Sequence, residues 1–468
     1  MSLSPEPPAT GFAFRLNGES VRVVDAPPTT TLLDWLRQTG RTGTKCGCAE
    51  GDCGACSVAL VDRTPGGEPT FRAINSCIAL LPMVAGREVV TVEGIADGAA
   101  LHPVQQAMVD HHGSQCGYCT PGFVVSLFEA WHRPAVTAAA GINDQLCGNL
   151  CRCTGYRAIR DAALAALAAR KAAGAGTTAV RSGDPIGPLA ACAYEQAGER
   201  FLRPGTLAEL LSLRRRHPAA VLVAGATEIG VELNKKFRPF PFLISTEAVP
   251  ELTRIAATPA EWRIGAAATL TAVEEALGGE FPSLAKMLAV FASRQIRNRA
   301  TLGGNLATAS PIGDSAPVLL TLDASLVLAA ELGERQVPLA DFFTGYRKTQ
   351  LRPDEIIREI VLPRAAAGEG LTRRVDFQKV SHRRELDISI VAAAFLLELD
   401  AAGVVRQVRL AYGGVADRPR RALRAEAALA GRTLAEAGAA VEAALQAEFN
   451  PIEDVRSGAT YRRGLVVS

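Results

Sequence analysis

Four cysteines near the N-terminus have the residue type and spacing to hold an inorganic redox centre. Cys48, Cys53 and Cys56 form a C-x4-C-x2-C pattern, and Cys77 follows in the segment INSCIALL. Gly51 and Gly54 lie between these cysteines, and Gly47 directly precedes Cys48. Thiolates bind iron, and glycines let backbone N–H groups approach the sulfur atoms of a cluster closely. The pattern therefore predicts a [2Fe–2S] cluster held by these four cysteines.

A second set of cysteines lies further along, in QCGYCTPG and NLCRCTGY. Its candidate ligands are Cys116, Cys119, Cys151 and Cys153, spaced C-x2-C and C-x1-C. Each pair is expected where a helix begins, because outward N–H groups and the helix dipole favour thiolate charge there. Four thiolates suit a structural zinc ion as well as an iron–sulfur cluster. The neighbouring first motif favours a second cluster, and zinc remains the alternative.

Three cysteines of the eleven remain outside both patterns: Cys46, Cys147 and Cys192. Neither spacing requires them, so we expect small apolar fillers or free thiols. The N-terminus MSLSPEPPATG lacks the charged and apolar parts of a signal segment, and nowhere do 18 apolar residues run together. A cytoplasmic location is therefore predicted, where many cysteines indicate metal or redox use rather than disulfides.

The elements around the first set predict a β-grasp fold. Residues 12–24 alternate apolar and polar around Asn17–Gly18, as in a tight hairpin. TTTLLDWLRQT offers threonine caps and an apolar face, which indicates a short helix. Segments near 57–61 and 88–93 resemble strands. With the plant-type ferredoxin spacing of the cysteines, this predicts a [2Fe–2S] ferredoxin-like domain over residues 10–95.

The elements around the second set are helical. Four helices are expected: from Pro103 to Gly113, from Thr120 to His132, near 142–149, and from after Gly155 to Gly174. They predict an all-α four-helix [2Fe–2S] domain over residues 96–173. Residues 174–192 are rich in Gly, Ser, Thr and Pro and are predicted to be a linker.

The third region contains two loops of small residues. In AVLVAGATEIG a buried strand, residues 220–224, opens into a turn that ends at Gly230, and a second turn is ATLGGNLATASPIGD, residues 300–314. Many N–H and hydroxyl donors with little bulk can cradle a pyrophosphate, although each loop alone could be an ordinary turn. Neither is a G-x-G-x-x-G element, so a Rossmann-type site is not indicated. Together with the cysteine domains, the two loops favour an FAD-binding domain.

The C-terminal region predicts an α+β lobe on this domain. Strand-like runs extend from about 372 to 415, and two Ala-rich helices follow near 422–430 and 433–447. The domain boundaries expected are 193–365 for the FAD-binding domain and 366–468 for the lobe. The whole chain is thus predicted to be a multidomain α+β protein. Its net charge of +2 gives no indication of nucleic acid or membrane binding, and the run Arg214–Arg216 is expected to be a solvated helix face.

These motifs give the chain a family resemblance over nearly its whole length. GCAEGDCGAC, QCGYCTPG, GNLCRCTGYR, VAGATEIG and ATLGGNLATASPIGD resemble, in the same order, the iron–sulfur/FAD subunits of the bacterial xanthine dehydrogenases, a branch of the molybdenum hydroxylase (xanthine oxidase) family. FFTGYRKTQL and KVSHRRELDI are similar to the rest of that flavin lobe. The resemblance implies a [2Fe–2S] cluster rather than zinc in the helical domain. It also implies an FAD domain of the PCMH/vanillyl-alcohol-oxidase-like type.

Carried over by position, the resemblance implies a set of FAD contacts. They are Leu222, Val223, Ala224, Gly225, Ala226, Thr227, Glu228, Ile229, Phe291, Thr301, Gly304, Asn305, Thr308, Ser310, Asp314, Ile357 and Lys379. Phe291 would pack against the isoalloxazine ring, although without the family it is equally a core aromatic. Ile357 stands where relatives often carry leucine. Asp387 and Ile388 lie where the family's chain passes near the flavin and would shape an NAD+ site.

A molybdenum-cofactor domain follows the flavin domain in single-chain relatives, whereas this chain stops at Ser468. The resemblance therefore implies a large molybdenum-cofactor-binding partner subunit, in a heterotetramer of two small and two large subunits. Hypoxanthine and xanthine would be oxidised to urate on that partner, in purine catabolism, with no catalytic residue for hydroxylation in this chain. Electrons would pass through the helical-domain cluster, the ferredoxin-type cluster and FAD to NAD+.

Two alternatives stay open at this point. One is the equivalent subunit of another molybdenum hydroxylase, an aldehyde or N-heterocycle dehydrogenase, because the partner would choose the substrate. The other is a zinc-stabilised binding scaffold without redox function, which would be colourless and free of flavin.

Overall fold

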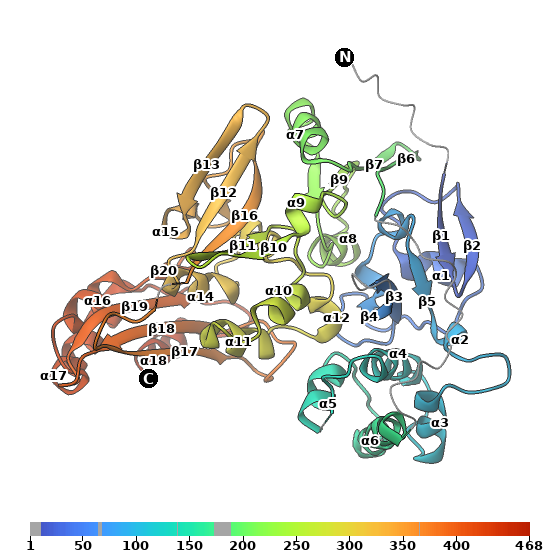
Figure 1. The fold of residues 1–468 in the computed structure, drawn as a ribbon, viewed down its shortest axis with the longest axis horizontal. Helices are drawn as coiled ribbons and strands as arrows, with labels where there is room; N and C mark the ends of the chain where they lie inside the picture. The colour runs from blue at the N-terminus through green and yellow to red at the C-terminus, as the bar shows by residue number, and fades with distance from the viewer. Residues whose placement is uncertain (1–10, 64–67, 138, 173–188, 365) are drawn as a thin grey trace. The chain divides into compact units, whose positions relative to one another are not determined.

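The computed structural model describes residues 11–63, 68–137, 139–172, 189–364 and 366–468 (Figure 1). Contacts divide the chain into two compact units. Unit 1 comprises residues 1–206, 220–249 and 293–300, and unit 2 comprises residues 207–219, 250–292 and 301–468. Most of the predicted linker, residues 174–192, lies outside the described residues, but its last residue, Cys192, begins a strand.

Unit 1 begins with a five-stranded sheet in the order β2-β1-β5-β3-β4. Its strands are β1 (Phe12–Leu16), β2 (Glu19–Val23), β3 (Ser57–Arg63), β4 (Pro69–Asn75) and β5 (Glu88–Val90). The predicted hairpin is present, and its turn residues Asn17 and Gly18 have φ of 53° and 85°. The predicted helix is α1 (Leu32–Gln38), capped by Thr31, whose side chain accepts the Asp34 N–H at 3.1 Å. Parallel pairing of β1 with β5 inside an otherwise antiparallel sheet gives the β-grasp arrangement that was predicted.

The four predicted helices of the next region are present. They are α3 (Pro103–Asp110), α4 (Thr120–Trp131), α5 (Ala139–Leu146) and α6 (Arg157–Ala172), and a short helix, α2 (Val92–Ile95), precedes them. α3 ends before the expected Gly113, and α5 begins earlier than expected. α4 is buried on nearly all sides because it packs on α5 and α6 and also on β3 and β4. Phe128 of α4 meets Phe71 of β4 edge to face, with ring centroids 4.7 Å apart.

A four-stranded sheet completes unit 1, in the order β6-β7-β9-β8. Its strands are β6 (Cys192–Gln196), β7 (Glu199–Arg203), β8 (Val221–Val223) and β9 (Phe242–Ser245). α8 (Ile229–Lys236) follows β8, and α12 (Arg294–Arg297) belongs to the same unit although it comes later in the chain. The predicted buried strand at 220–224 is thus present as β8.

Unit 2 contains an antiparallel sheet in the order β10-β11-β16-β12-β13. Its strands are β10 (Ile255–Ala257), β11 (Glu261–Gly265), β12 (Ser325–Ala330), β13 (Gly333–Pro338) and β16 (Ile356–Pro363). A small hairpin consists of β14 (Phe343–Gly345) and β15 (Lys348–Thr349). The helices of this part are α7 (Leu207–Arg216), α9 (Pro250–Thr253), α10 (Leu270–Leu277), α11 (Pro282–Ala289), α13 (Leu302–Ala307), α14 (Ser315–Thr321) and α15 (Leu339–Phe342).

The C-terminal lobe of unit 2 has a second antiparallel sheet, β17-β18-β19-β20. The strands are β17 (Thr372–Val380), β18 (Val391–Leu399), β19 (Val405–Gly413) and β20 (Arg420–Arg421). Three helices follow: α16 (Leu423–Leu429), α17 (Leu434–Glu448) and α18 (Ala459–Val467). The three long strands and the first two helices were predicted, whereas α18 was not. Across the described parts of the chain, every helix is too short or too polar to span a lipid bilayer.

Candidate functional site

The first cysteine set occupies the loop from α1 to β3, and Cys77 lies in a short helical turn, η1 (Ser76–Ile78). Backbone N–H groups are directed at its sulfur atoms. The Sγ of Cys48 accepts the N–H groups of Asp52 and Cys53, each at 3.3 Å, and the N–H of Cys48 donates to the Sγ of Cys53 at 3.3 Å. Such N–H···S bonds stabilise thiolates and tune the cluster that they hold.

Glycine is sterically required at two places in this loop. A Cβ on Gly47 would lie only 2.6 Å from the Sγ of Cys53. Gly54 has φ of 67°, and a Cβ there would overlap the carbonyl oxygen of Gly148 in the helical domain. The glycines therefore admit a sulfur atom on one side and a second backbone on the other.

The four thiols of the first set lie close together, and hydrogen bonds between them lower the pKa of two and raise the pKa of the other two. Hydrogen bonds from Cys53 and Cys77 lower the pKa of the Cys48 thiol, and a hydrogen bond from Cys77 lowers that of Cys56. The pKa of Cys77 is raised because it donates to Cys48 and Cys56, and that of Cys53 is raised by its hydrogen bond to Cys48. The pairs Cys48–Cys53, Cys48–Cys77 and Cys56–Cys77 thus connect all four sulfurs, which fit the donor set of a cluster bound by four thiolates.

The second set lies beside the first turns of two helices, as predicted. Cys119 is the residue before α4, and Cys151 and Cys153 precede α6. The thiols form two pairs. The Cys153 thiol donates to Cys116 and its pKa is raised for that reason, while burial and then a hydrogen bond to Cys151 raise the pKa of Cys119 to about 12. Thr154 contacts the Sγ of Cys151 through its hydroxyl at 3.1 Å and its N–H at 3.5 Å.

The second set supplies four thiols, enough for either an iron–sulfur cluster or a zinc ion. Over residues 11–63, 68–137, 139–172, 189–364 and 366–468, no three His, Cys, Asp or Glu side chains are arranged around a single metal ion. A zinc site needs four ligands around one ion, whereas a [2Fe–2S] cluster takes two ligands on each of two irons.

The three cysteines outside the patterns have separate surroundings. Cys46 is exposed, and its carbonyl oxygen accepts the hydroxyl of Tyr118. Cys147 is half-buried after α5, and Cys192 lies in β6, where burial raises the pKa of its thiol. That none of the three binds a metal stays a prediction.

The two cysteine loops contact each other directly. The N–H of Leu150, the residue before Cys151, donates to the carbonyl oxygen of Cys53 at 3.0 Å. The side-chain amide of Asn149 donates to the carbonyl oxygen of Gly54 at 3.3 Å. A ligand of each predicted cluster is thus joined to a ligand of the other through one hydrogen bond and a few covalent bonds.

The first predicted FAD loop runs from β8 into α8, all within unit 1. Leu222 and Val223 belong to β8, Ile229 is the first residue of α8, and Ala226 between them has φ of 62°. A Cβ on Gly225 would overlap the carbonyl oxygen of Arg299. Position 225 in this half-buried loop therefore requires glycine, because the backbone of Arg299 lies against it.

Helix α8 connects this loop to the first cysteine set. A Cβ on Gly230 would lie 2.6 Å from the carbonyl oxygen of Ile78. The side-chain amide of Asn234 donates to the carbonyl oxygens of Ala49 at 2.9 Å and Cys77 at 2.7 Å. The helix that begins in the predicted FAD loop thus ends against the loop that holds the predicted ferredoxin-type cluster.

The second predicted FAD loop lies in unit 2. Thr301 caps α13 by accepting the N–H of Gly304 at 3.0 Å, and Asn305 accepts the hydroxyl of Ser315. Thr308 is the C-cap of the same helix, and the Ser310 hydroxyl accepts the N–H of Ile312 at 3.4 Å. These bonds fix the short helix and the turn that follows it.

At the end of this loop, Asp314 forms a buried ion pair with Lys379, at 2.8 Å, and accepts the hydroxyl of Ser389. Lys379 also donates to the carbonyl oxygen of Val290, at 3.2 Å. Both predicted FAD residues therefore have protein partners, and Ser389 was not among the predicted ones.

The other predicted residues of unit 2 differ in exposure. Phe291 is half-buried directly after α11, whereas Ile357 is buried in β16 opposite Leu328. Asp387 accepts the N–H of Arg383 at 3.1 Å, and Ile388 is exposed.

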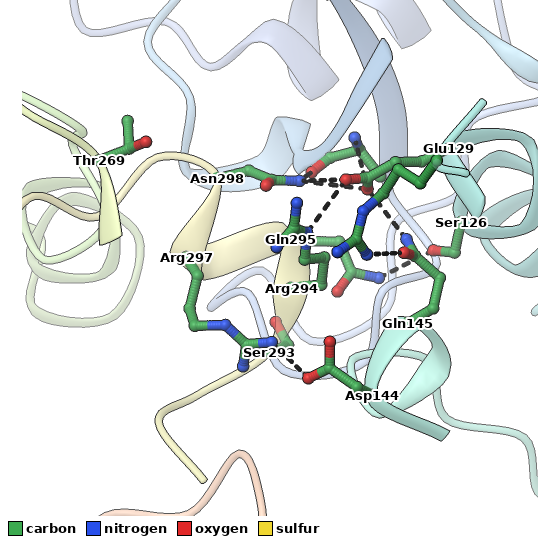
Figure 2. A network of polar contacts seen from close by, with 12 residues as sticks. Ser126, Glu129, Asp144, Gln145, Thr269, Ser293, Arg294, Gln295, Arg297 and Asn298 are labelled. Atoms are coloured by element: carbon green, nitrogen blue, oxygen red, sulfur yellow. Dashed lines mark hydrogen bonds and ion pairs between the residues drawn. The ribbon is translucent and has the colours of Figure 1, made fainter. Parts of the chain in front are cut away.

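One buried polar network in unit 1 was not predicted from the sequence (Figure 2). Its centre is Glu129 of α4, fully buried and paired with the equally buried Arg294 of α12 at 3.1 Å. Glu129 also accepts the N–H of Ala73, at 3.0 Å, and the amides of Gln145, at 3.0 Å, and Asn298, at 3.2 Å. No sequence signal identifies these residues, because a single Glu in an apolar helix and an Arg far along the chain form no pattern.

A second buried charge cluster holds the turn that contains Arg299 in place. Glu247 pairs with Arg87 and with Arg299, each at 2.7 Å. Burial opposes the ionised form of Glu247, but Arg299, Arg87 and Arg203 together outweigh it and lower the pKa of the carboxyl. The carboxylate therefore remains charged and links the ferredoxin-like sheet to the backbone that supports Gly225.

Four family models match successive parts of the chain. They are a 2Fe-2S iron-sulfur cluster binding domain over residues 14–81 and a [2Fe-2S] binding domain over residues 91–164. An FAD binding domain in molybdopterin dehydrogenase follows over residues 195–365, and a CO dehydrogenase flavoprotein C-terminal domain over residues 377–468.

Two similar curated relatives are named xanthine dehydrogenase and xanthine dehydrogenase/oxidase. The chain is 35% identical to the xanthine dehydrogenase of Emericella nidulans over 97% of its own length and 38% of that relative. It is 34% identical to the xanthine dehydrogenase/oxidase of Gallus gallus over 91% of its length and 37% of the relative. The chain therefore spans well under half of these proteins.

Solved structures of two other enzymes share part of the fold. A carbon monoxide dehydrogenase from Hydrogenophaga pseudoflava, in a form that lacks the Mo-pyranopterin moiety of the molybdenum cofactor, matches with a TM-score of 0.54 and 28% identity. The match covers 57% of this chain and 92% of that one. Quinoline 2-oxidoreductase from Pseudomonas putida 86 matches with a TM-score of 0.52 and 26% identity, over 57% and 91%.

The order of these domains agrees with the order of the cysteine loops and of the two small-residue loops. The predicted multidomain α+β fold is confirmed, with two 2Fe–2S domains followed by an FAD-binding domain. The chain belongs to the molybdenum hydroxylase family, of which it carries the iron–sulfur and FAD-binding region.

Proposed function

We propose that this chain is the electron-transfer subunit of a cytoplasmic xanthine dehydrogenase. The two [2Fe–2S] clusters would carry single electrons from a molybdenum centre on a partner subunit, and FAD would pass them as a hydride to NAD+. The residues of this chain would bind these groups in sequence and orient them.

One observation carries the proposal: three predicted cofactor segments of unit 1 are hydrogen-bonded in series. The loop before Cys151 is bonded to the ferredoxin-like loop through Leu150 and Cys53. That loop is bonded to α8 through Asn234. α8 begins in the first predicted FAD loop. This order matches a relay from the helical-domain cluster to the ferredoxin-type cluster and then to FAD.

The proposed ligands of the clusters are the eight cysteines of the two sets. The ferredoxin-type cluster would be held by Cys48, Cys53, Cys56 and Cys77, and the helical-domain cluster by Cys116, Cys119, Cys151 and Cys153. FAD would contact residues 222–229, the loop from Thr301 to Asp314, and the side chains of Phe291, Ile357 and Lys379.

The entry point for electrons would lie at the helical-domain cysteines. Cys116 and Cys153 are exposed. Near them in the sequence, Tyr118, Leu150 and Tyr156 are 49%, 39% and 43% exposed. Exposed ligands with exposed large side chains near them in the sequence suit docking of a large molybdenum-cofactor-binding subunit. The assembly proposed is a heterotetramer of two small and two large subunits.

The exit for electrons would lie in unit 2. A cavity of about 410 Å³ there is lined by the cationic side chains of Lys286, Lys379, Arg383 and Arg384, together with His382, Phe377 and Val290. Cationic groups beside an apolar wall suit the phosphates and a ring of a dinucleotide. Asp387, one of the two residues proposed for the NAD+ site, accepts the backbone N–H of Arg383, which lines this cavity. The other residue proposed for that site is Ile388.

The names of the curated relatives favour hypoxanthine and xanthine as substrates, oxidised to urate in purine catabolism. The quinoline oxidoreductase among the structural matches keeps an N-heterocycle dehydrogenase as the alternative. Because the substrate would bind the partner, activity of the purified complex with xanthine, an aldehyde and quinoline separates these possibilities. Turnover of an aldehyde or of quinoline without turnover of xanthine would contradict the purine proposal.

An anaerobic titration of the full chain with NADH tests the relay itself. One FAD and two [2Fe–2S] clusters accept four electrons, so about two NADH per chain should bleach both the flavin and the cluster absorbance. Bleaching of flavin while the clusters stay oxidised would contradict the relay, provided that dithionite reduces them. No reduction at all by NADH would contradict NAD+ as the acceptor.

A further inference from the structure

The two cysteine loops meet at a junction lined by glycines from three segments. A Cβ on Gly54 would overlap the carbonyl oxygen of Gly148, and a Cβ on Gly122 of α4 would overlap the carbonyl oxygen of Gly54. No larger residue fits at these positions without moving a backbone. The contact between the ferredoxin-like loop and the helical domain is therefore a direct backbone-to-backbone contact.

Asn149 bridges this junction with a side chain that is only 2% exposed. Its Nδ2 donates to the carbonyl oxygen of Gly54 at 3.3 Å. Its Oδ1 accepts two donors, the hydroxyl of Ser126 at 2.7 Å and the Nε2 of Gln295 at 2.8 Å. Because both donors face the oxygen, the amide has one orientation that satisfies all three bonds, with its NH₂ group toward Gly54.

Gln295 comes from a distant part of the sequence. It is 1% exposed, and it donates to Ser126 at 2.9 Å as well as to Asn149. It belongs to α12, which the Glu129 network anchors through Arg294 and Asn298, as Figure 2 shows. The segment 293–300 that carries Gln295 directly precedes Thr301, the first residue of the second predicted FAD loop.

A single hydrogen bond between two loops leaves them free to rotate about it. The bond from Leu150 to Cys53 joins the loops beside the glycine contacts, and the bond from Asn149 to Gly54 adds a second point of attachment one residue away on both loops. Two adjacent bonds fix both the separation and the angle of the loops. Gly54 lies between Cys53 and Cys56, and Asn149 lies two residues before Cys151, so the clamp acts directly on predicted ligands.

We propose that Asn149, oriented by Gln295, is a positioning residue that sets the electronic coupling between the two clusters. The proposal rests on the proposed function, since it needs both clusters to be present. The amide of Asn149 would position the two loops and would not itself react. It also makes Gln295 act through Asn149, so the two residues should behave as one unit.

The test uses the full chain with its clusters and FAD, and three variants: Asn149→Ala, Gln295→Ala and the double variant. Gln145→Ala is the matched control, because Gln145 is an equally buried amide of the same network, bonded to Glu129 and Arg133 but not to Asn149. Asn149→Asp is a second variant of similar shape that keeps an acceptor and loses the donor to Gly54. Iron content confirms loading in every sample.

Two readouts are measured: the rate at which an electron equilibrates between the clusters after pulse reduction, and the spin–spin interaction in the electron paramagnetic resonance spectrum of the reduced chain. Asn149→Ala and Asn149→Asp should slow equilibration about tenfold and weaken the interaction, as a small displacement of redox partners does. Gln295→Ala should have a smaller effect of the same kind, and the double variant should match Asn149→Ala. Gln145→Ala should match the wild type.

Wild-type rates and spectra in the fully loaded Asn149 variants would overturn the proposal. Effects of the two single variants that add in the double variant would overturn the claim that Gln295 acts through Asn149. A wild-type chain without two cluster signals would instead contradict the proposed function, so the two failures are distinguishable.

Discussion

Cys46 and Cys53 lie in the same loop, but their surroundings differ. The Sγ of Cys53 accepts a backbone N–H and is hydrogen-bonded to Cys48, whereas Cys46 is exposed. We therefore expect Cys46→Ser to keep about four irons per chain and Cys53→Ser to lose one two-iron cluster. Iron analysis with electron paramagnetic resonance checks this. Loss of a cluster signal in Cys46→Ser would show that the ligand set is misassigned.

His102 is a residue whose protonation should control stability. It caps α3 by accepting the N–H of Val104 through Nδ1 at 3.2 Å, which requires a neutral ring. Burial, and then the neighbouring His132, lower the pKa of His102 from 6.5 to about 4. Between these values the unfolded chain binds the proton and the folded chain does not. Stability should therefore fall as the pH falls through this window, by at most about 3 kcal/mol.

Urea midpoints measured above pH 6.5 and between pH 4 and 6.5 test this effect of the lowered pKa. His102→Asn keeps a cap acceptor and should flatten the pH dependence, whereas the exposed His112→Asn should leave it unchanged. An equally steep dependence in His102→Asn would assign the titration to another group.

At the residue scale, the sequence predicts the cysteines because their pattern is local. All four cysteines of the first set lie within thirty residues of one another. Asn149 and Gln295 were missed because their contact joins residues 146 positions apart, and nothing near either one signals it. Polar residues that act only through folded neighbours leave no spacing pattern.

Among the elements, α4 contributes the carboxylate of a buried ion pair, and the stability of the fold should depend on that pair. Glu129 and Arg294 are both fully buried, so loss of the carboxylate removes the negative charge that faces a cation in the interior. Glu129→Gln should lower the free energy of unfolding by about 3 to 5 kcal/mol. The control Glu195→Gln removes an exposed pair with Arg200 in the same unit and should cost about 1 kcal/mol or less. Equal urea midpoints for the two variants would contradict a structural role for the network.

The turn between β8 and α8 should tolerate only glycine at position 225. A Cβ there overlaps the carbonyl oxygen of Arg299, whereas a Cβ on Gly205 has no neighbour closer than 3.7 Å. Gly225→Ala should therefore lower the FAD content of the purified chain by about tenfold or more, and Gly205→Ala should leave it unchanged. Flavin absorbance after denaturation measures both. Full FAD occupancy in Gly225→Ala would exclude this loop from the FAD site.

Elements with local signals were predicted, and those that depend on distant packing were not. The β1–β2 hairpin and α1 have a turn pair and a threonine cap in their own sequence. β4 was missed, and its residue Ala73 is held by Glu129 and Asn298, both far away in the chain. The four-residue helix α12 was also missed, because its buried arginines suggest a surface segment until their partners are known.

At the scale of the whole molecule, the order of domains was predictable but the assignment of segments to units was not. Residues 220–249 and 293–300 lie in the sequence range predicted for FAD binding, yet they belong to unit 1 with the cysteine domains. The reason is physical: α8 and α12 make their buried polar contacts with the cysteine loops and with α4. The FAD-binding domain predicted from the sequence thus contributes residues 220–249 and 293–300 to unit 1, which contains the two cysteine domains.

The central claim is that both cysteine sets hold iron–sulfur clusters in series with a flavin. Metal and flavin analysis of the anaerobically purified full chain, with a visible spectrum, tests it most directly. The account predicts about four irons and one FAD per chain, no stoichiometric zinc, and a coloured sample. A colourless sample with zinc in place of iron at the second cysteine set would contradict it.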